Sequence, residues 1–350
     1  MSEDFFTTIN DPSHYLRFKS QKLKVYQDSF LHSFSALEGL INNKQRGSLF
    51  HDKLLFDREW KSGDEKRFIQ AACELTVVSY FAKISPDTFV YEPTLREGNK
   101  KNVECQVKVT DFTYNIEVKC PTFDAIEAQN LDNNIRLHTP VRMDEPYRKL
   151  VEDIKQMLNQ HIKQSGDNLP EYVNPKRMDV VLKEFLKSAG EKFPVNFDEK
   201  TVNILVVCCD GKNSLQEFFN YLFLLGGFFN KNHNEDILPV LAYENLDVVV
   251  LCNLYYRHNK YFVKENIDNH FNFDSSFNLI FDNLNRKTKE EKNSAVEYFI
   301  HSILPNHTFD LINFRDNDGN WPDISPVDLR ELFLIPEYLS NPGILPYRYF

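Results

Sequence analysis

Hydrophobic and polar residues alternate on both sides of a short turn within residues 103–119. In the first arm, which starts at Val103, the apolar positions are odd-numbered, and in the second arm, which starts at Tyr114, they are even-numbered. Alternation with a period of two predicts a strand with one apolar and one polar face. The apolar faces of both arms can share one core only if odd-numbered residues of the first arm pair with even-numbered residues of the second arm. A two-residue turn at Asp111 and Phe112 meets that condition.

The predicted hairpin gathers charged side chains on its polar face. With this turn, Glu104 faces Lys119 across the ladder and Glu117 lies diagonal to it, so the three groups lie within roughly 5–8 Å of one another. Two carboxylates and an ammonium at this spacing suit a divalent-cation site for phosphodiester hydrolysis. They suit equally a solvated hairpin face with an ordinary ion pair.

Residues 64–83, which precede the hairpin, have the period of a helix. The apolar positions that fall on one stripe are Phe68, Ala71, Ala72, Leu75, Val78 and Ala82. Glu74 lies at the border of that stripe, so its carboxylate is expected to lean over the sheet edge. The alternative is that Glu74 is a helix-surface carboxylate.

The pattern along the rest of the central chain alternates strands and helices. A strand is expected at residues 88–91, followed by a polar loop at 96–101 and then by the hairpin. Downstream, the expected order is helix, strand, helix, strand, at residues 179–192, 203–208, 214–225 and 247–251. This order predicts an α/β fold with a mixed central sheet flanked by helices.

The order of these acidic positions resembles that of the PD-(D/E)XK nuclease superfamily, which has the restriction-endonuclease-like fold. The matching features are a helix with a border acid at Glu74, a strand that opens with Glu104, and a strand that ends in Glu117 and Lys119. The resemblance covers roughly residues 61–263. In one departure, Val103 and Glu104 stand where the family usually has Pro-Asp, so the carboxylate is one methylene longer.

The resemblance implies a Mg²⁺- or Mn²⁺-dependent nuclease. Glu104, Glu117 and the Val118 carbonyl would hold the metal, Glu74 would complete its shell or bind a second ion, and Lys119 would act on the attacking water. DNA is the substrate that the family implies, in restriction, phage defence, mobile-element processing or repair. The alternative is a nuclease-fold binding or assembly module that cleaves weakly or not at all and acts through a protein partner; a homodimer is compatible with either function.

The charge distribution is unusual for a protein that binds nucleic acid. The chain has 41 Lys and Arg against 51 Asp and Glu, a net charge of −10, whereas phosphate-binding surfaces are usually basic. Residues 266–350 hold seven basic and thirteen acidic residues, while residues 136–192 hold eleven and nine. The candidate phosphate contacts, each of which could instead be a solvated surface charge, are Lys100, Lys101, Arg142, Arg148, Lys149, Lys176 and Arg177.

Three regions are expected: a helical N-terminal extension at residues 1–60, a nuclease-like core at 61–265 with an insertion at 124–175, and an acidic region at 266–350. The first residues lack a signal-peptide pattern and no apolar run could span a membrane, so a cytoplasmic protein is predicted.

The six cysteines are expected to be free and mostly to act as small core residues, because Cys208 and Cys209 lack the spacing of a zinc half-site.

Overall fold

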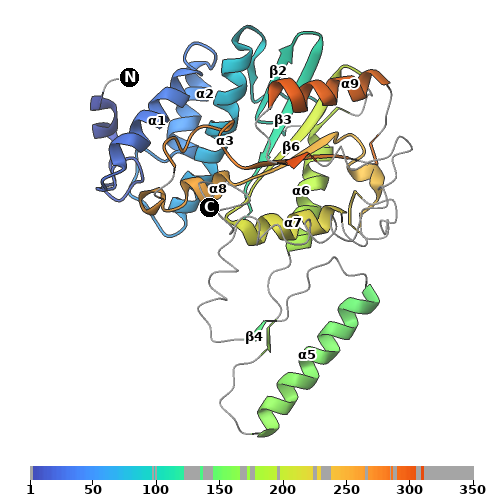
Figure 1. Ribbon diagram of the computed structural model, residues 1–350. Coiled ribbons are helices and arrows are strands. Elements are labelled where there is room, and N and C mark those ends of the chain that lie inside the picture. Colours follow the sequence, from blue (N-terminus) through green and yellow to red (C-terminus); the bar gives the residue numbers. More distant parts are fainter. Residues whose placement is uncertain are drawn as a thin grey trace.

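A seven-stranded mixed sheet forms the centre of the computed structural model (Figure 1). The structure describes residues 3–96, 98, 101–121, 135–136, 145–165, 172–173, 178–194, 198–223, 227–229, 238–264, 267–283, 285–286, 290–304 and 309–310. The strand order is β1-β2-β3-β6-β7-β8-β9. Helices cover the sheet, so the α/β class expected from the sequence is confirmed.

The sheet combines an antiparallel hairpin with parallel strands. The strands are β1 (Val90–Tyr91), β2 (Cys105–Val109), β3 (Phe112–Lys119), β6 (Thr201–Cys208), β7 (Val248–Cys252), β8 (Asn278–Asp282) and β9 (Phe309–Asp310). The β1–β2, β2–β3 and β7–β8 pairs are antiparallel, and the β3–β6, β6–β7 and β8–β9 pairs are parallel. β6 and β7 are buried along almost their whole length, which explains their continuous apolar sequence.

Two helices connect the parallel strands. α6 (Met178–Lys192) joins β3 to β6 along the chain, and α7 (Lys212–Phe223) lies between β6 and β7. α6 packs against α7, and α7 packs on β7. The predictions of helices at 179–192 and 214–225 and of strands at 203–208 and 247–251 are therefore confirmed to within two residues at each boundary.

α3 (Asp64–Ile84) packs across β2 and β3 and corresponds to the helix predicted at 64–83. Asp64 and Glu65 in its first turn and Lys83 in its last turn complement the helix dipole. Most of its side chains are buried because the N-terminal helices cover the face opposite the sheet. α1 (Leu23–Ser35) and the π-helix η2 (Ser48–Lys53) pack directly on α3, and η1 (Glu3–Thr8) and α2 (Asn43–Gly47) are the other N-terminal elements.

The remaining described elements lie around this core. They are η3 (Pro86–Thr88), η4 (Val240–Ala242), α8 (Leu254–His258), η5 (Tyr261–Val263), α9 (Glu290–Tyr298) and the π-helix η6 (Phe299–Ile303). α5 (Glu145–Ser165) and the short parallel pair β4 (Ile135–Arg136) and β5 (Tyr172–Val173) lie apart from the main sheet (Figure 1).

The hairpin register differs by two residues from the predicted one. Val109 pairs with Phe112, so the turn consists of Thr110 and Asp111. Thr110 adopts a left-handed φ of 54°, and the earlier turn lets Phe112 join β3, where its ring packs 5.8 Å from that of Tyr298. The odd-with-even pairing is confirmed, since a shift of two keeps every side chain on its expected face.

Candidate metal and catalytic site

Glu104 immediately precedes β2, whose register begins with Cys105 opposite Ile116, so the predicted pairing of Glu104 with Lys119 is wrong. The Glu104 N–H donates to the Ile116 carbonyl at 3.0 Å, and the next pair, Cys105 with Ile116, continues the ladder. In addition, the Val118 N–H donates to Glu104 Oε2 at 3.2 Å. The Glu104 and Glu117 side chains also form a hydrogen bond with each other, so the two carboxyl groups are in contact.

Two lysines neutralise the Glu117 carboxylate, which is fully buried. Lys119 Nζ and Lys192 Nζ each lie 2.6 Å from Glu117 Oε1, and Lys192 also donates to Oε2 at 2.7 Å. Lys119 comes from the same strand, whereas Lys192 is the last residue of α6. Lys119 is about twice as exposed as Lys192, at 23% against 12%, so Lys119 has more freedom to contact a bound ligand.

The two facing carboxylates have opposite pKa shifts. Burial, followed by repulsion from Glu117, raises the pKa of Glu104 well above its ordinary value. Burial also acts to raise the pKa of Glu117, but the hydrogen bond with Glu104 and the ammonium groups of Lys119 and Lys192 lower it. Glu117 in turn raises the pKa of Lys119 in spite of burial. Of the two carboxyl groups, Glu104 therefore binds a proton more readily and Glu117 more readily keeps its negative charge.

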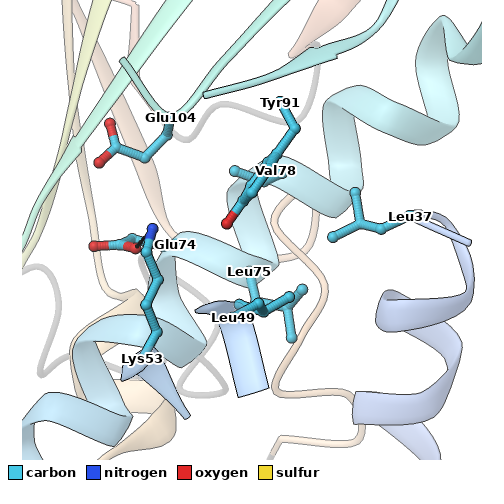
Figure 2. Close-up of a pocket in the computed structure, with 8 residues that line it drawn as sticks. All are labelled: Leu37, Leu49, Lys53, Glu74, Leu75, Val78, Tyr91 and Glu104. Atoms are coloured by element: carbon cyan, nitrogen blue, oxygen red, sulfur yellow. Dashed lines mark hydrogen bonds and ion pairs between the residues drawn. The ribbon is translucent and has the colours of Figure 1, made fainter. Parts of the chain in front are cut away.

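Glu74 reaches the same site from α3 across a small pocket (Figure 2). Lys53 Nζ lies 2.9 Å from Glu74 Oε2 and 2.7 Å from Glu92 Oε1. Figure 2 shows the side chains of Glu104, Glu74 and Lys53 at one end of the pocket and apolar side chains at the other. The apolar lining is Leu37, Leu49, Leu75, Val78 and Tyr91. Glu74 therefore leans toward the sheet edge, as its position at the border of the helix stripe predicted.

The next polar row of the same sheet face consists of amides that bind one another. Gln106 donates to Asn115 at 2.7 Å, and Asn115 donates to Asn203 at 2.8 Å, across β2, β3 and β6. Asn203 also donates to the Asn245 carbonyl at 2.6 Å. These side chains satisfy one another's hydrogen bonds, so the row is structural. The Glu104–Glu117 pair differs because both members are carboxyl groups that compete for one proton.

The donor set of the facing acids fits a hard divalent cation. Glu104 and Glu117 offer carboxylate oxygens, which Mg²⁺ and Mn²⁺ prefer, and burial together with repulsion from Glu117 raises the pKa of Glu104. Val118 contacts Glu104 through its N–H. Among the described residues, Glu74, Glu104 and Glu117 do not form a set whose donor atoms all lie within 4.8 Å; Cys73, Cys120 and Cys208 do.

The predicted phosphate contacts lie mostly outside the described residues. That is so for Lys100, Arg142, Lys176, Arg177 and the side chain of Arg148. Lys149 is exposed on α5. Lys101 Nζ lies 2.8 Å from Glu191 Oε2 on α6, so this lysine already has an acidic partner.

Sequence reasoning missed three charged residues of the site: Lys53, Glu92 and Lys192. Lys192 contacts Glu117 across a separation of 75 residues, and Lys53 contacts Glu74 across 21. Neither lysine belongs to a motif with the acids. Lys192 does end a predicted helix that precedes a predicted strand. That placement was the one feature of the sequence that could have predicted Lys192 near Glu117.

Comparison with protein-family models, curated proteins and solved structures finds no match for this chain. Among the described helices, none combines the length and the apolar character needed to cross a membrane.

Proposed function

We propose that the protein is a Mg²⁺- or Mn²⁺-dependent nuclease that hydrolyses phosphodiester bonds, with DNA as its substrate. The observation that carries the proposal is the contact between the Glu104 and Glu117 carboxyl groups, with Lys119 at 2.6 Å from Glu117 and Glu74 near Glu104 at one end of the adjoining pocket (Figure 2). Carboxylates that can hold a divalent cation, with a lysine beside them, suit phosphodiester hydrolysis, which requires stabilisation of the negative charge that develops on the phosphate.

The order of the elements supports the same proposal. α3 is followed by the antiparallel strands β1, β2 and β3, then by α6 and the parallel strand β6. This is the order on which the resemblance to the restriction-endonuclease-like fold rests. The fold alone does not determine the activity, so the site residues carry the argument.

Glu104 and Glu117 would hold the cation, with Glu74 near Glu104 at the same end of the pocket (Figure 2). When bound, the cation would supply positive charge that polarises a water molecule and stabilises the charge developing on the phosphate. Glu104 must release its proton for binding, since a protonated carboxyl is a poor ligand. The buried Lys192 would hold Glu117 in position from α6.

Lys119 would interact with the substrate side of the site. Its ammonium lies 2.6 Å from Glu117 and is partly exposed, so it can donate a hydrogen bond to the attacking water or to a phosphate oxygen. Because Glu117 keeps this lysine charged, its role is orientation and charge stabilisation.

The test is cleavage of duplex DNA, single-stranded DNA and RNA by the purified full-length protein with Mg²⁺ or Mn²⁺, and with a chelator. Lys119→Ala should abolish cleavage and leave the fold intact, since Lys192 still neutralises Glu117. Lys108→Ala is the matched control, because Lys108 is an exposed lysine on the neighbouring strand β2. Equal cleavage by Lys119→Ala and wild type would exclude the proposed site.

A second function, a binding module on a nuclease-like fold, has one observation in its favour. Glu117 already has two ammonium partners, and Glu74 already has Lys53. The acids are thus largely neutralised by the protein's own lysines. Absence of cleavage of all three substrates, together with nucleic-acid binding that is independent of divalent cations, would support this function.

A further inference from the structure

Four of the six cysteines converge at the carboxyl ends of neighbouring parallel strands. Cys120 directly follows β3, Cys208 ends β6 and Cys252 ends β7. Lys119 pairs with Val207, so Cys120 and Cys208 occupy the next positions along these strands, and Cys208 pairs with Cys252. Cys73 approaches the same place from α3.

The sulfur atoms lie close to one another. The Sγ atoms of Cys73, Cys120 and Cys208 all lie within 4.8 Å, and Cys252 Sγ lies 3.8 Å from Cys208 Sγ. All four are free thiols. Ligands at about 2.3 Å from a tetrahedral zinc ion lie about 3.8 Å from each other, so only a small contraction would let the first three thiols bind one ion.

The cluster has a buried side and an accessible side. Cys73, Cys208 and Cys252 are fully buried, whereas Cys120 is partly exposed. Gln70 Nε2 donates to the Cys120 carbonyl at 3.4 Å and links this segment to α3 about one turn before Cys73. An ion could therefore enter beside Cys120 and meet ligands that separate elements already hold in place.

We propose that Cys73, Cys120 and Cys208 form a site for one thiophilic cation of the d¹⁰ class, Zn²⁺ or Cu⁺. Thiolate ligands select these ions over Mg²⁺ and Mn²⁺, so the site is chemically distinct from the Glu104–Glu117 pair. Cys252 contacts Cys208 and supports the trio from β7.

The bound ion would join α3 to the ends of β3 and β6. Cys73 is adjacent to Glu74, and Cys120 is adjacent to Lys119. The ion would thus fix the helix that carries Glu74 against the strand that carries Glu117 and Lys119. This role is structural and does not depend on the proposed nuclease activity.

The alternative is that the thiols are small core residues, and metal binding by the full-length protein separates the two. The protein is prepared reduced and metal-free and is then titrated with Co²⁺, whose thiolate complexes absorb by sulfur-to-cobalt charge transfer. We expect this absorption to saturate at one ion per chain and to disappear when Zn²⁺ is added. Cu⁺ under anaerobic reductant is the second arm, and competition between the two ions identifies the preferred one.

Cys120→Ala is the decisive variant because the partly exposed Cys120 is the least costly of the three to remove. It should lose the charge-transfer absorption and the rise in melting temperature that Zn²⁺ produces, while Cys105→Ala, a buried cysteine of β2, should retain both. Reduced thiols that bind neither ion would overturn the proposal. So would absorption that persists in Cys120→Ala, or a disulfide within the trio that resists reductant. None of these results depends on whether the protein cleaves nucleic acid.

Discussion

Glu104 is the residue through which pH should act on the stability of the acid site. Its pKa in the folded protein is raised above the ordinary value of 4.5. The folded state therefore binds this proton more tightly than the unfolded state does. The stabilisation that Glu104 contributes is present below pH 4.5 and is lost as the pH rises through the raised pKa.

Glu104→Gln should abolish that loss, because glutamine keeps an oxygen for the Val118 N–H and an amide N–H for Glu117 without titrating. In metal-free buffer the variant and wild type should melt at similar temperatures at pH 4.5, and the variant should melt higher at alkaline pH. Thermal unfolding across this range is the measurement, and Glu38→Gln, at an exposed glutamate, is the control. Parallel curves for Glu104→Gln and wild type would contradict the prediction.

Glu104→Gln also distinguishes the metal-dependent nuclease from the binding module. If Glu104 is a ligand, added Mn²⁺ should stabilise wild type at alkaline pH and should stabilise Glu104→Gln less, because an amide is a weaker ligand than a carboxylate. Equal stabilisation of both would place the ion elsewhere.

At the scale of elements, α6 is positioned by a close contact at Gly190. A Cβ atom on Gly190 would lie 2.0 Å from the carbonyl oxygen of Ala242 in η4. Lys192, which binds Glu117, follows two residues later. Packing of α6 against η4 thus places the lysine at the acid site.

Gly190→Ala should lower the free energy of unfolding by about 1–3 kcal/mol, because backbone must move to relieve the overlap. Gly47→Ala is the matched control, since Gly47 also lies in a helix but a Cβ atom added there would meet no other atom within 4 Å. There alanine should raise stability by about 0.5–1 kcal/mol. Urea denaturation measures both, and equal effects would show that α6 does not approach η4 so closely.

At the scale of the whole molecule, a buried ion pair joins α9 to the central sheet. Lys292 Nζ lies 2.8 Å from Asp247 Oδ2 and also donates to the Thr201 carbonyl, and the Asn203 N–H donates to Asp247 Oδ2 at 2.7 Å. Both charged side chains are almost fully buried. The pair connects a helix near the C-terminal end of the described chain to β6 and to the start of β7.

Lys292→Met should cost about 3–5 kcal/mol, because it leaves the Asp247 carboxylate buried without its ammonium. The double variant Lys292→Met with Asp247→Asn should recover most of that loss. The free energy of unfolding in urea is the measurement. A single variant as stable as wild type would mean that solvent reaches Asp247.

The acidic charge of the whole chain limits how it can bind DNA. If the contacts are confined to basic residues between Lys100 and Lys192, the slope of log affinity against log salt should be on the order of −2 to −5, at about −0.9 per neutralised phosphate. Arg148→Ala with Lys149→Ala should make it shallower still. A steep slope that these substitutions leave unchanged would place the DNA surface elsewhere.

A truncation test of the acidic region must spare β8, which pairs with β7 inside the sheet. Removal of residues 311–350, which hold three basic and six acidic residues, should leave DNA affinity unchanged or raise it. Loss of binding by a folded truncated protein would make that segment the recognition element.

The sequence by itself determined the features that depend on neighbouring residues. Periods of two and 3.6 located the hairpin faces, α3, α6, β6 and β7, because side chains a few positions apart must share a buried face. The alternation also placed Glu104, Glu117 and Lys119 on one polar face. β8 was missed, since its five residues follow a stretch rich in Asn, Asp and Ser that resembles a loop.

Only the tertiary structure decided which residues meet. The turn lies at Thr110 and Asp111, so Glu104 contacts Glu117 and does not face Lys119. The alternation of apolar and polar residues could not reveal this, because a register shift of two residues leaves every side chain on the same face of the sheet. Lys192 reached Glu117, and Cys73 reached Cys120 and Cys208, through the packing of α6 and α3 on the sheet. Contacts over such separations depend on how elements pack, and no local period in the chain records them.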